Sequence, residues 1–143
     1  MTRKVYLDTG VIMLNFVKQP SQKIQKLYDQ FQNGTSQAYI LEPALEEMAY
    51  QLCVAYGKAK VDTFVHSFLQ NNYIHVIRPT LNLITESGIL KCKYRTFLSY
   101  YDALIITYCL REKIELHTTE KRMRKNFRSD IVNKLKIIPY MFD

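Results

Sequence analysis

Acidic residues follow predicted strands or begin predicted helices at four separate places in the sequence. These places are Asp8, the pair Glu46 and Glu47, Asp102, and Glu120. In an open α/β sheet, residues at the carboxyl ends of the strands face one crevice at the edge of the sheet. We therefore expect carboxylates from these four places to converge, although the chain separates them widely.

Carboxylates that converge without a His or Cys cluster beside them form a site whose ligands are all oxygen atoms. Such a set suits Mg²⁺ or Mn²⁺, which bind carboxylate, carbonyl and water oxygens. Ions held in this way can activate a water molecule and stabilise the leaving oxygen when a phosphodiester bond is cleaved. The histidines, at positions 66, 75 and 117, have no metal-ligand spacing, and His117 ends an apolar strand, which favours a structural role.

Each acid also has an ordinary structural explanation. Asp8 could cap the first helix, because Asp is a favoured N-cap residue. Residues 99–102 have the S-x-x-D pattern of a capping box, and Glu120 could complement the dipole of the helix after it. The paired glutamates could be solvated helix surface. Each explanation is adequate alone, but independent caps need not all recur at the crevice side of successive units.

Basic residues lie next to two of these acids in the sequence. The run after Glu120 contains Lys121, Arg122, Arg124 and Lys125, and the segment before Asp102 contains Lys91, Lys93 and Arg95. We expect these cations to grip the phosphates of a nucleic acid, although a solvated helix face is the usual alternative for a charge run. Tyr94, Tyr100, Tyr101 and Phe127 could stack on unpaired bases, although aromatic residues at helical spacing also form cores.

Short apolar runs alternate with amphipathic segments, which predicts alternating strands and helices. We expect strands at 5–7, 38–41, 73–77, 114–117 and 135–138, and helices at 11–17, 24–31, 43–56, 61–68, 81–90, 99–111 and 120–127. A basic turn, 91–95, is expected before the helix that contains Asp102. Strands that alternate with helices in this way form a parallel sheet with helices on both faces.

The composition is that of a globular protein with a polyanionic partner. A length of 143 residues with 48% hydrophobic content predicts one domain over residues 1–143, with a core that needs no disulfide. The formal charge of +7 favours a polyanion such as nucleic acid. Cys53, Cys92 and Cys109 form no C-x-x-C pair and are expected to be buried thiols. With no long apolar run and no signal peptide, we expect a soluble cytoplasmic protein.

The segments that carry the acids resemble the four successive motifs of PIN-domain ribonucleases. They are 5–9, 45–48, 98–105 and 116–120, and the match runs from about Lys4 to Phe127. The order and spacing carry the resemblance, and the D-A-L-I block after L-S is its strongest part. It implies a three-layer α/β/α fold with a central parallel sheet of about five strands, a divalent-metal site for Mg²⁺ or Mn²⁺, and cleavage of single-stranded RNA.

The subfamily nearest in size is the VapC-type toxin of toxin–antitoxin pairs, which implies an antitoxin protein as a partner. We also expect a homodimer. Position by position, the resemblance implies Asp8, Glu47, Asp102 and Glu120 as the metal-binding and catalytic residues. Glu47 matches the family register, whereas helix geometry places Glu46 nearer the apolar edge, so Glu46 stays the alternative ligand.

The chain departs from the family pattern at two positions. Gly10 stands where the family usually has Asn, and Glu120 stands where a fourth Asp is usual. These departures leave open a catalytically degenerate protein that binds RNA or a partner. Among nucleases, a housekeeping RNA-processing enzyme is the alternative to a toxin. A receiver domain is excluded because the third strand ends in Arg78 and Pro79 without a phosphoacceptor Asp, and isolated glycines exclude a nucleotide-binding loop.

Overall fold

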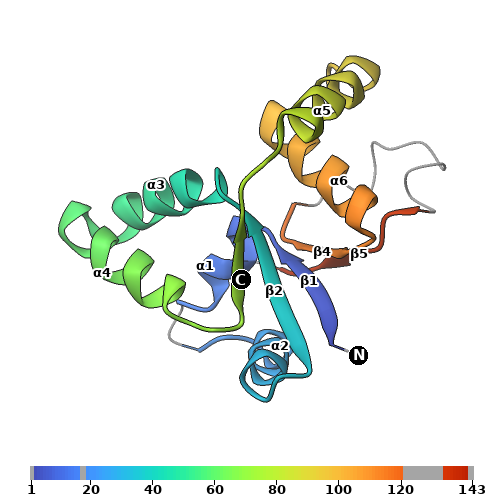
Figure 1. Ribbon diagram of the computed structural model, residues 1–143. Helices are drawn as coiled ribbons and strands as arrows, with labels where there is room; N and C mark the ends of the chain where they lie inside the picture. The colour runs from blue at the N-terminus through green and yellow to red at the C-terminus, as the bar shows by residue number, and fades with distance from the viewer. Residues whose placement is uncertain (1, 17–18, 121–133, 142–143) are drawn as a thin grey trace.

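Five parallel strands form a single sheet in the computed structural model, which describes residues 2–16, 19–120 and 134–141 (Figure 1). The strands are β1 (Arg3–Leu7), β2 (Ser36–Leu41), β3 (Ile74–Ile77), β4 (Glu115–Thr118) and β5 (Ile137–Pro139). Their order across the sheet is β3-β2-β1-β4-β5, and every pairing is parallel. The predicted parallel sheet of about five strands is therefore confirmed.

Helices cover both faces of this sheet. They are α1 (Thr9–Leu14), α2 (Gln22–Gln32), α3 (Ala44–Tyr56), α4 (Lys58–Leu69), α5 (Leu81–Lys93) and α6 (Tyr100–Glu112). Successive strand residues point to opposite faces. Val5 and Leu7 of β1 are buried in a core with α1 to α4, whereas Tyr6 is buried in a second core with α5 and α6. The predicted three-layer α/β/α fold is confirmed by these two cores.

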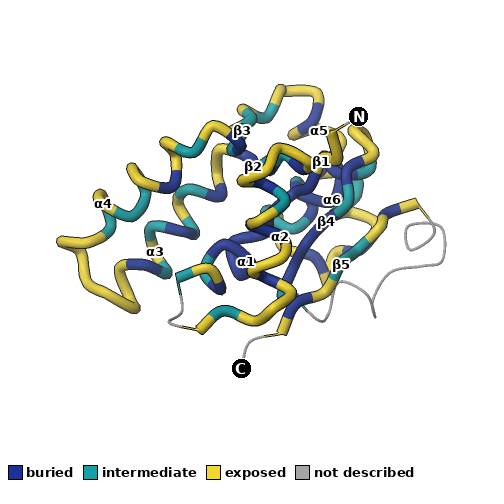
Figure 2. Tube along the Cα trace, turned by 90° about the horizontal axis from the view of Figure 1, so that it is seen from below, coloured by how far each residue is buried: buried dark blue, intermediate teal, exposed yellow. Residues whose placement is uncertain are grey.

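Strand β1 lies at the centre of the molecule, between β2 and β4, and Figure 2 shows it among the buried parts of the trace. In the parallel register, Leu7 of β1 stands opposite His117 of β4. The Asp8 N–H continues this pairing by donating to the His117 carbonyl oxygen at 3.0 Å. The carboxyl ends of β1 and β4 therefore lie side by side, and each is followed by one of the predicted site residues.

The structure corrects several details of the sequence prediction. Helix α1 spans residues 9–14 rather than 11–17, because its cap lies at Asp8. Lys91 and Lys93 belong to the last turn of α5 rather than to a basic turn, where cations complement the helix dipole. The predicted basic helix at 120–127 lies almost wholly outside the described residues. None of the described helices is long and apolar enough to span a membrane.

The prediction of three buried thiols is wrong for two of them. Cys53 and Cys92 are exposed, and only Cys109 is buried. Both exposed cysteines lie in the outer helices α3 and α5, on faces that no other layer covers. The apolar character of a free thiol misled the prediction, since the residue type alone does not say which side of an amphipathic helix it occupies.

His117 is a buried histidine with a partner at each ring nitrogen. Its Nε2 lies 2.8 Å from a Glu115 carboxylate oxygen and its Nδ1 lies 2.7 Å from the Tyr140 hydroxyl oxygen. Because a carboxylate only accepts, Nε2 carries the proton and Nδ1 accepts from the tyrosine hydroxyl. Burial lowers the pKa of His117 to about 4, although the Glu115 carboxylate acts in the opposite direction. The neutral ring thus has a structural role.

Acidification should weaken the wild-type protein more than a His117→Gln variant between about pH 6.5 and pH 4. In this range the histidine of the unfolded chain takes up a proton while the folded ring stays neutral, so stability falls as the pH falls. The wild type should lose up to about 1.4 kcal/mol per pH unit more than the variant. Urea unfolding of both proteins at several pH values measures the two slopes, and equal slopes would contradict this assignment.

Candidate active site

Asp8 follows β1 directly and is fixed by two hydrogen bonds. One carboxylate oxygen accepts from the Thr9 N–H at 2.9 Å, which caps helix α1, and the other accepts from the Thr118 hydroxyl at 2.7 Å. The side chain is buried, with 9% of the residue exposed. The capping explanation is thus correct for Asp8, but the second bond, from the end of β4, also holds the carboxylate at the carboxyl edge of the sheet.

Thr118 joins the first and last acids of the predicted site. Its hydroxyl donates to Asp8 and accepts from the Glu120 N–H at 3.0 Å. One buried side chain therefore sets the position of a carboxylate on one strand and the backbone of the acid that follows the neighbouring strand. The sequence interpretation assigned no role to Thr118, although a hydroxyl residue two positions before an acid at a strand end was a usable signal.

Asp102 lies in the first turn of α6. Its backbone N–H donates to the Ser99 hydroxyl oxygen at 3.0 Å, so the predicted cap at Ser99 is present. The cap uses the backbone of Asp102, and the carboxylate lines a cavity at the carboxyl edge of the sheet. Capping and site formation are therefore compatible at Asp102, as they are at Asp8.

The cavity has a volume of about 630 Å³ and is lined mainly by acids and tyrosines. The lining includes Glu46, Glu47, Asp102 and Glu120, together with Tyr50 and Tyr101. These residues come from α3, from the start of α6 and, in the case of Glu120, from the segment just after β4. Distant parts of the chain therefore meet here. The structure thus brings the predicted acids to one edge of the sheet, with Asp8 buried behind them.

Asp8 lies in the electrostatic field of the other acids. Burial raises the pKa of its carboxyl above the usual value, and the charges of Asp102 and Glu120 raise it further. The hydrogen bonds from Thr118 and from the Thr9 N–H act in the opposite direction. The charged form of Asp8 is therefore disfavoured in the folded protein, which is the expected condition of a carboxylate placed among others.

Glu47 faces this group more closely than Glu46 does. Burial raises the pKa of Glu47, and so do the charges of Asp8 and Asp102, whereas an interaction with the Thr9 hydroxyl lowers it. Its Oε1 also accepts from the Gln51 amide at 3.2 Å. Glu46 lines the same cavity but is exposed. Of the two glutamates, Glu47 is therefore the one that interacts with Asp8.

Tyr101 lies between the core and the acids. Its hydroxyl is buried, and burial raises the pKa of that phenol, as do the nearby charges of Asp8 and Glu47. The tyrosine therefore stays protonated and keeps a hydrogen-bond donor at the floor of the cavity. The sequence interpretation offered Tyr101 as a base-stacking residue, but its ring is packed in the core on one side and only partly exposed.

A divalent cation fits the chemistry of these residues. The four carboxylates offer only oxygen atoms, and no cation in the described part of the chain forms an ion pair with Asp8 or Glu47. As they are placed, no three acidic, His or Cys side chains among the described residues could hold one ion together. The acids interact electrostatically, but their side chains are too far apart to bind one ion together. A bound cation would have to draw these side chains toward one another.

Gly10, one of the two departures from the family pattern, lies against the residue before Glu120. A Cβ atom at position 10 would stand 2.0 Å from the Thr119 hydroxyl oxygen and 3.1 Å from the Thr119 Cβ. The start of α1 and the end of β4 therefore approach so closely that only glycine fits the present packing. Gly10 thus has a steric reason that motif comparison did not reveal.

Several predicted RNA contacts cannot be placed or are changed by the structure. Lys121, Arg122, Arg124, Lys125 and Phe127 lie outside the described residues. Tyr94 is buried, at 5% exposure, and cannot present its ring to a base. Tyr100 is 80% exposed beside Asp102, and Tyr50, which the sequence interpretation missed, is 69% exposed at the cavity.

The sequence profile of the PIN domain matches residues 5–126, which is most of the chain. The chain belongs to the PIN domain family. The resemblance seen in the four motifs is thereby confirmed, and the predicted acids occupy the carboxyl edge of a PIN domain sheet. No curated protein matches the chain in sequence.

Solved structures show the same fold. VapBC2 from Rickettsia felis, bound to a DNA fragment from its promoter, superposes with a TM-score of 0.72 at 17% identity, covering 96% of this chain and 98% of that one. DNA-bound VapBC from Salmonella typhimurium gives 0.67 at 12% identity, covering 97% and 98%. VapC20 from Mycobacterium tuberculosis, described as a toxin that cleaves the sarcin–ricin loop, gives 0.62 at 11%, covering 90% and 93%. At these identities the likeness establishes the fold.

Asp8→Asn should raise the melting temperature of the metal-free protein at pH 7, by roughly 2–5 °C for each kcal/mol of repulsion removed. Asn keeps the helix cap but removes a charge whose pKa is raised in the folded state. The advantage should shrink as the pH falls, because the folded wild type then binds more protons than the unfolded chain and gains stability. Thermal melts in chelator at pH 7 and pH 4.5 measure this.

Added Mn²⁺ should raise the melting temperature of the wild type more than that of Asp8→Asn, since an ion that binds the native state stabilises it by mass action. Asp62→Asn, on the exposed surface of α4, removes one negative charge from a residue that does not line the cavity and serves as the control. If Asp8→Asn is neutral without metal and Mn²⁺ shifts both proteins equally, the acids do not act as one group.

Proposed function

We propose that this PIN domain is a metal-dependent endoribonuclease that cleaves single-stranded RNA and acts as the toxin of a toxin–antitoxin pair. The observation that carries the proposal is the meeting of Asp8, Glu47, Asp102 and Glu120 at one edge of the sheet, where the charges of the neighbouring acids help to raise the pKa values of Asp8 and Glu47. Acids that served only as independent helix caps would not need to lie close enough to interact electrostatically. Phosphodiester hydrolysis by Mg²⁺ or Mn²⁺ is the chemistry that such an all-oxygen set supports.

In this proposal the residues have different parts. Asp8, held by Thr9 and Thr118, is the rigid member, while Glu47, Asp102 and Glu120 line the cavity that a phosphate would enter. The bound ion would supply an activated water and stabilisation of the leaving oxygen. The Tyr101 hydroxyl stays protonated but is buried, so in the present arrangement it supports the floor of the cavity and does not contact a phosphate.

The proposed role as a toxin rests on the solved structures that share this fold. The similar structures from Rickettsia felis, Klebsiella pneumoniae and Salmonella typhimurium are toxin–antitoxin complexes, and that from Mycobacterium tuberculosis is an RNA-cleaving toxin. We accordingly propose an antitoxin protein as the partner of this chain, residues 1–143 as one domain, and a homodimer as its assembly.

The purified protein should cut an unstructured RNA when Mg²⁺ or Mn²⁺ is present and should stop when a chelator is added. Asp102→Asn should abolish cleavage while leaving RNA binding largely intact, because it changes a cavity carboxylate and keeps the N-terminal cap of α6. Glu112→Gln, at the exposed opposite end of the same helix, should cleave like the wild type. Gel analysis of end-labelled RNA measures the products.

Two outcomes would count against the proposal. Cleavage that survives Asp102→Asn would remove the carboxylates from the mechanism. Tight RNA binding without cleavage in any divalent metal would favour a catalytically degenerate protein that retains only its binding surface.

Exposed tyrosines beside the acids favour unpaired bases as the substrate. Tyr50 lines the cavity from α3 with 69% of its surface exposed, and Tyr100 is 80% exposed at the start of α6. The Lys91 amino group lies 4.8 Å from the centre of the Tyr100 ring and adds positive charge there. Aromatic faces next to cations are how proteins hold single strands without reading their sequence, because every base has a face to stack.

Tyr50→Ala should weaken binding of single-stranded RNA by about 1–3 kcal/mol, the usual worth of one stacked base. Tyr50→Phe should bind like the wild type, since it keeps the ring. Val54→Ala, one turn further along α3 and 72% exposed, removes apolar surface away from the cavity and should have no effect. Fluorescence anisotropy in chelator measures binding without cleavage. Equal losses for Tyr50→Ala and Tyr50→Phe would assign the effect to the hydroxyl instead of stacking.

A further inference from the structure

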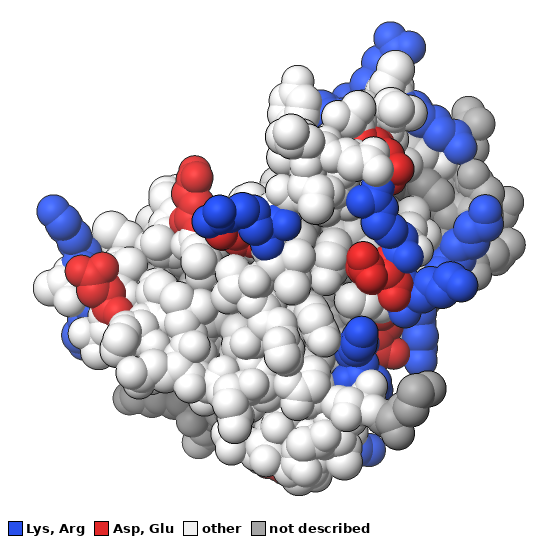
Figure 3. All heavy atoms as spheres, viewed as in Figure 1, with Lys and Arg blue, Asp and Glu red and all other residues white. Residues whose placement is uncertain are grey.

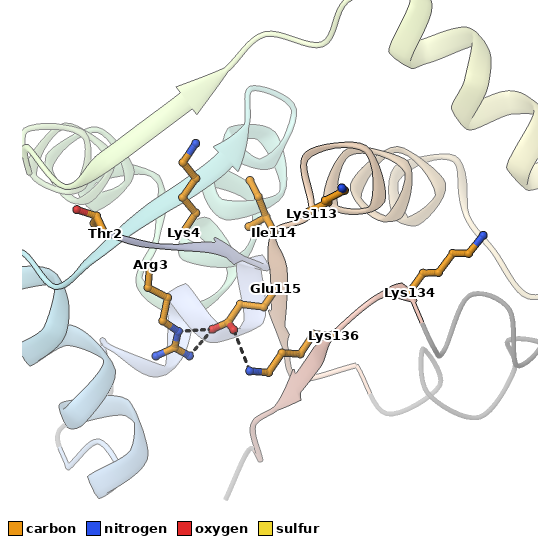
Figure 4. Close-up of a pocket in the computed structure, with 8 residues that line it drawn as sticks. All are labelled: Thr2, Arg3, Lys4, Lys113, Ile114, Glu115, Lys134 and Lys136. Carbon is orange, nitrogen blue, oxygen red and sulfur yellow. Dashed lines mark hydrogen bonds and ion pairs between the residues drawn. The ribbon is translucent and has the colours of Figure 1, made fainter.

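A second cavity, of about 450 Å³, lies at the opposite edge of the sheet from the acids (Figure 4). It is formed by the amino ends of β1, β4 and β5, three strands whose carboxyl ends point toward the other edge. Its lining includes five cations, Arg3, Lys4, Lys113, Lys134 and Lys136, and one acid, Glu115. These cations come from three distant stretches of the chain, so the fold itself gathers them.

The single acid does not neutralise this group. Glu115, whose side chain is 10% exposed, forms ion pairs with Arg3 and Lys136 and also contacts His117. Figure 4 shows Arg3 and Lys136 turned toward Glu115, whereas the ends of Lys4, Lys113 and Lys134 turn away from it. Among the residues that the structure describes, neither Lys113 nor Lys134 has a carboxylate partner. Positive charge therefore remains available for a ligand.

The backbone conformation of Lys113 is a second, independent observation that points to a function for this cavity. It ends α6 in the left-handed conformation, with φ 56° and ψ 45°, and is the one non-glycine residue with positive φ in the described chain. Glycine is the usual residue at such a helix end, and a side chain there costs conformational free energy. A strained residue of this kind points to a function for its side chain, here a cation at the mouth of the cavity.

We propose that this basic cavity binds backbone phosphates of the same single-stranded RNA that the acids cleave, at a point several nucleotides from the cut. The proposal rests on the proposed function for the identity of the polyanion. Lysines are point charges that suit phosphate, and the lining residues that the structure describes include no aromatic ring for a base, so the cavity would hold the backbone without reading sequence. An acidic peptide is disfavoured because protein interfaces need an apolar centre, and the one large apolar residue of this lining, Ile114, is 4% exposed.

The distance between the two sites sets a length requirement on the RNA. Strand β1 has 5 residues, which at about 3.3 Å each separates its ends by roughly 16 Å. A strand that follows the surface from the acids to the basic cavity must cover more than this straight distance. Figure 3 shows Lys and Arg side chains gathered on the side of the molecule that carries β4 and β5. A short oligonucleotide could occupy only one site, whereas a longer one could reach both.

The test measures binding of a 20-nucleotide and a 4-nucleotide unstructured RNA to the full chain in chelator, so that no cleavage is needed. Lys113→Asn removes the charge and places a residue that tolerates the left-handed conformation, so the fold should be as stable as the wild type or more so. Its affinity for the long RNA should fall roughly fourfold at 0.15 M salt, and the salt slope should become shallower by about 0.7. Lys134→Gln should act in the same way, and the short RNA, which cannot reach both sites at once, should bind the wild type more weakly than the long RNA does.

Two controls separate this site from overall charge. Lys113→Arg should keep the wild-type affinity, and Lys60→Gln, on the exposed surface of α4, removes one charge far from the cavity and should change nothing. Unchanged affinity and salt slope in Lys113→Asn and Lys134→Gln would overturn the inference. It would also be overturned by equal losses in Lys60→Gln, or by variants that lose binding of poly-glutamate but not of RNA. A wild type that binds long RNA through this cavity but never cleaves would refute the proposed function alone.

Discussion

The pairing of β1 with β4 is the contact on which the rest of the site depends. It sets Leu7 opposite His117 and extends by one more hydrogen bond, from the Asp8 N–H to the His117 carbonyl oxygen. Without this register Thr118 could not donate to Asp8 while receiving the Glu120 N–H. A slip of one residue in a parallel pair would turn every side chain to the other face of the sheet. The two cores that flank β1 therefore fix the register, and the register fixes the positions of the acids.

The same contact brings several carboxylates close together, which is electrostatically unfavourable. Burial and neighbouring carboxylates disfavour the charged form of Asp8, and its two hydrogen bonds offset only part of that cost. The opposite edge has the reverse arrangement, with five cations around one acid and a lysine in a strained helix end. The molecule thus holds negative charge at the carboxyl ends of its strands and positive charge at the amino ends. The packed core between the two edges must offset the unfavourable free energy of both charge clusters.

Sequence reasoning located the strands, the layers and the places where acids would gather, since these follow from apolar periodicity and from the topology of parallel sheets. It could not see what depends on close approach. Thr118 is an ordinary strand residue until its hydroxyl is found between Asp8 and Glu120, and Tyr50 looks like any helix aromatic until its exposure is known. The basic cavity escaped notice because Lys113 and Lys4 are far apart in sequence. Cys53 and Cys92 were misjudged because exposure on an outer helix depends on which neighbours are absent.

The tight fit between Gly10 and Thr119 links two positions that share one small volume. A Cβ at position 10 would stand 2.0 Å from the Thr119 hydroxyl oxygen, so the space for a larger residue at position 10 must come from Thr119. A larger residue at position 10 therefore requires the Thr119 side chain to rotate or shift, so the effect of a change at position 10 depends on the residue at position 119. Gly10 and Thr119 are thus coupled through space, which a list of motif residues compared one position at a time does not show.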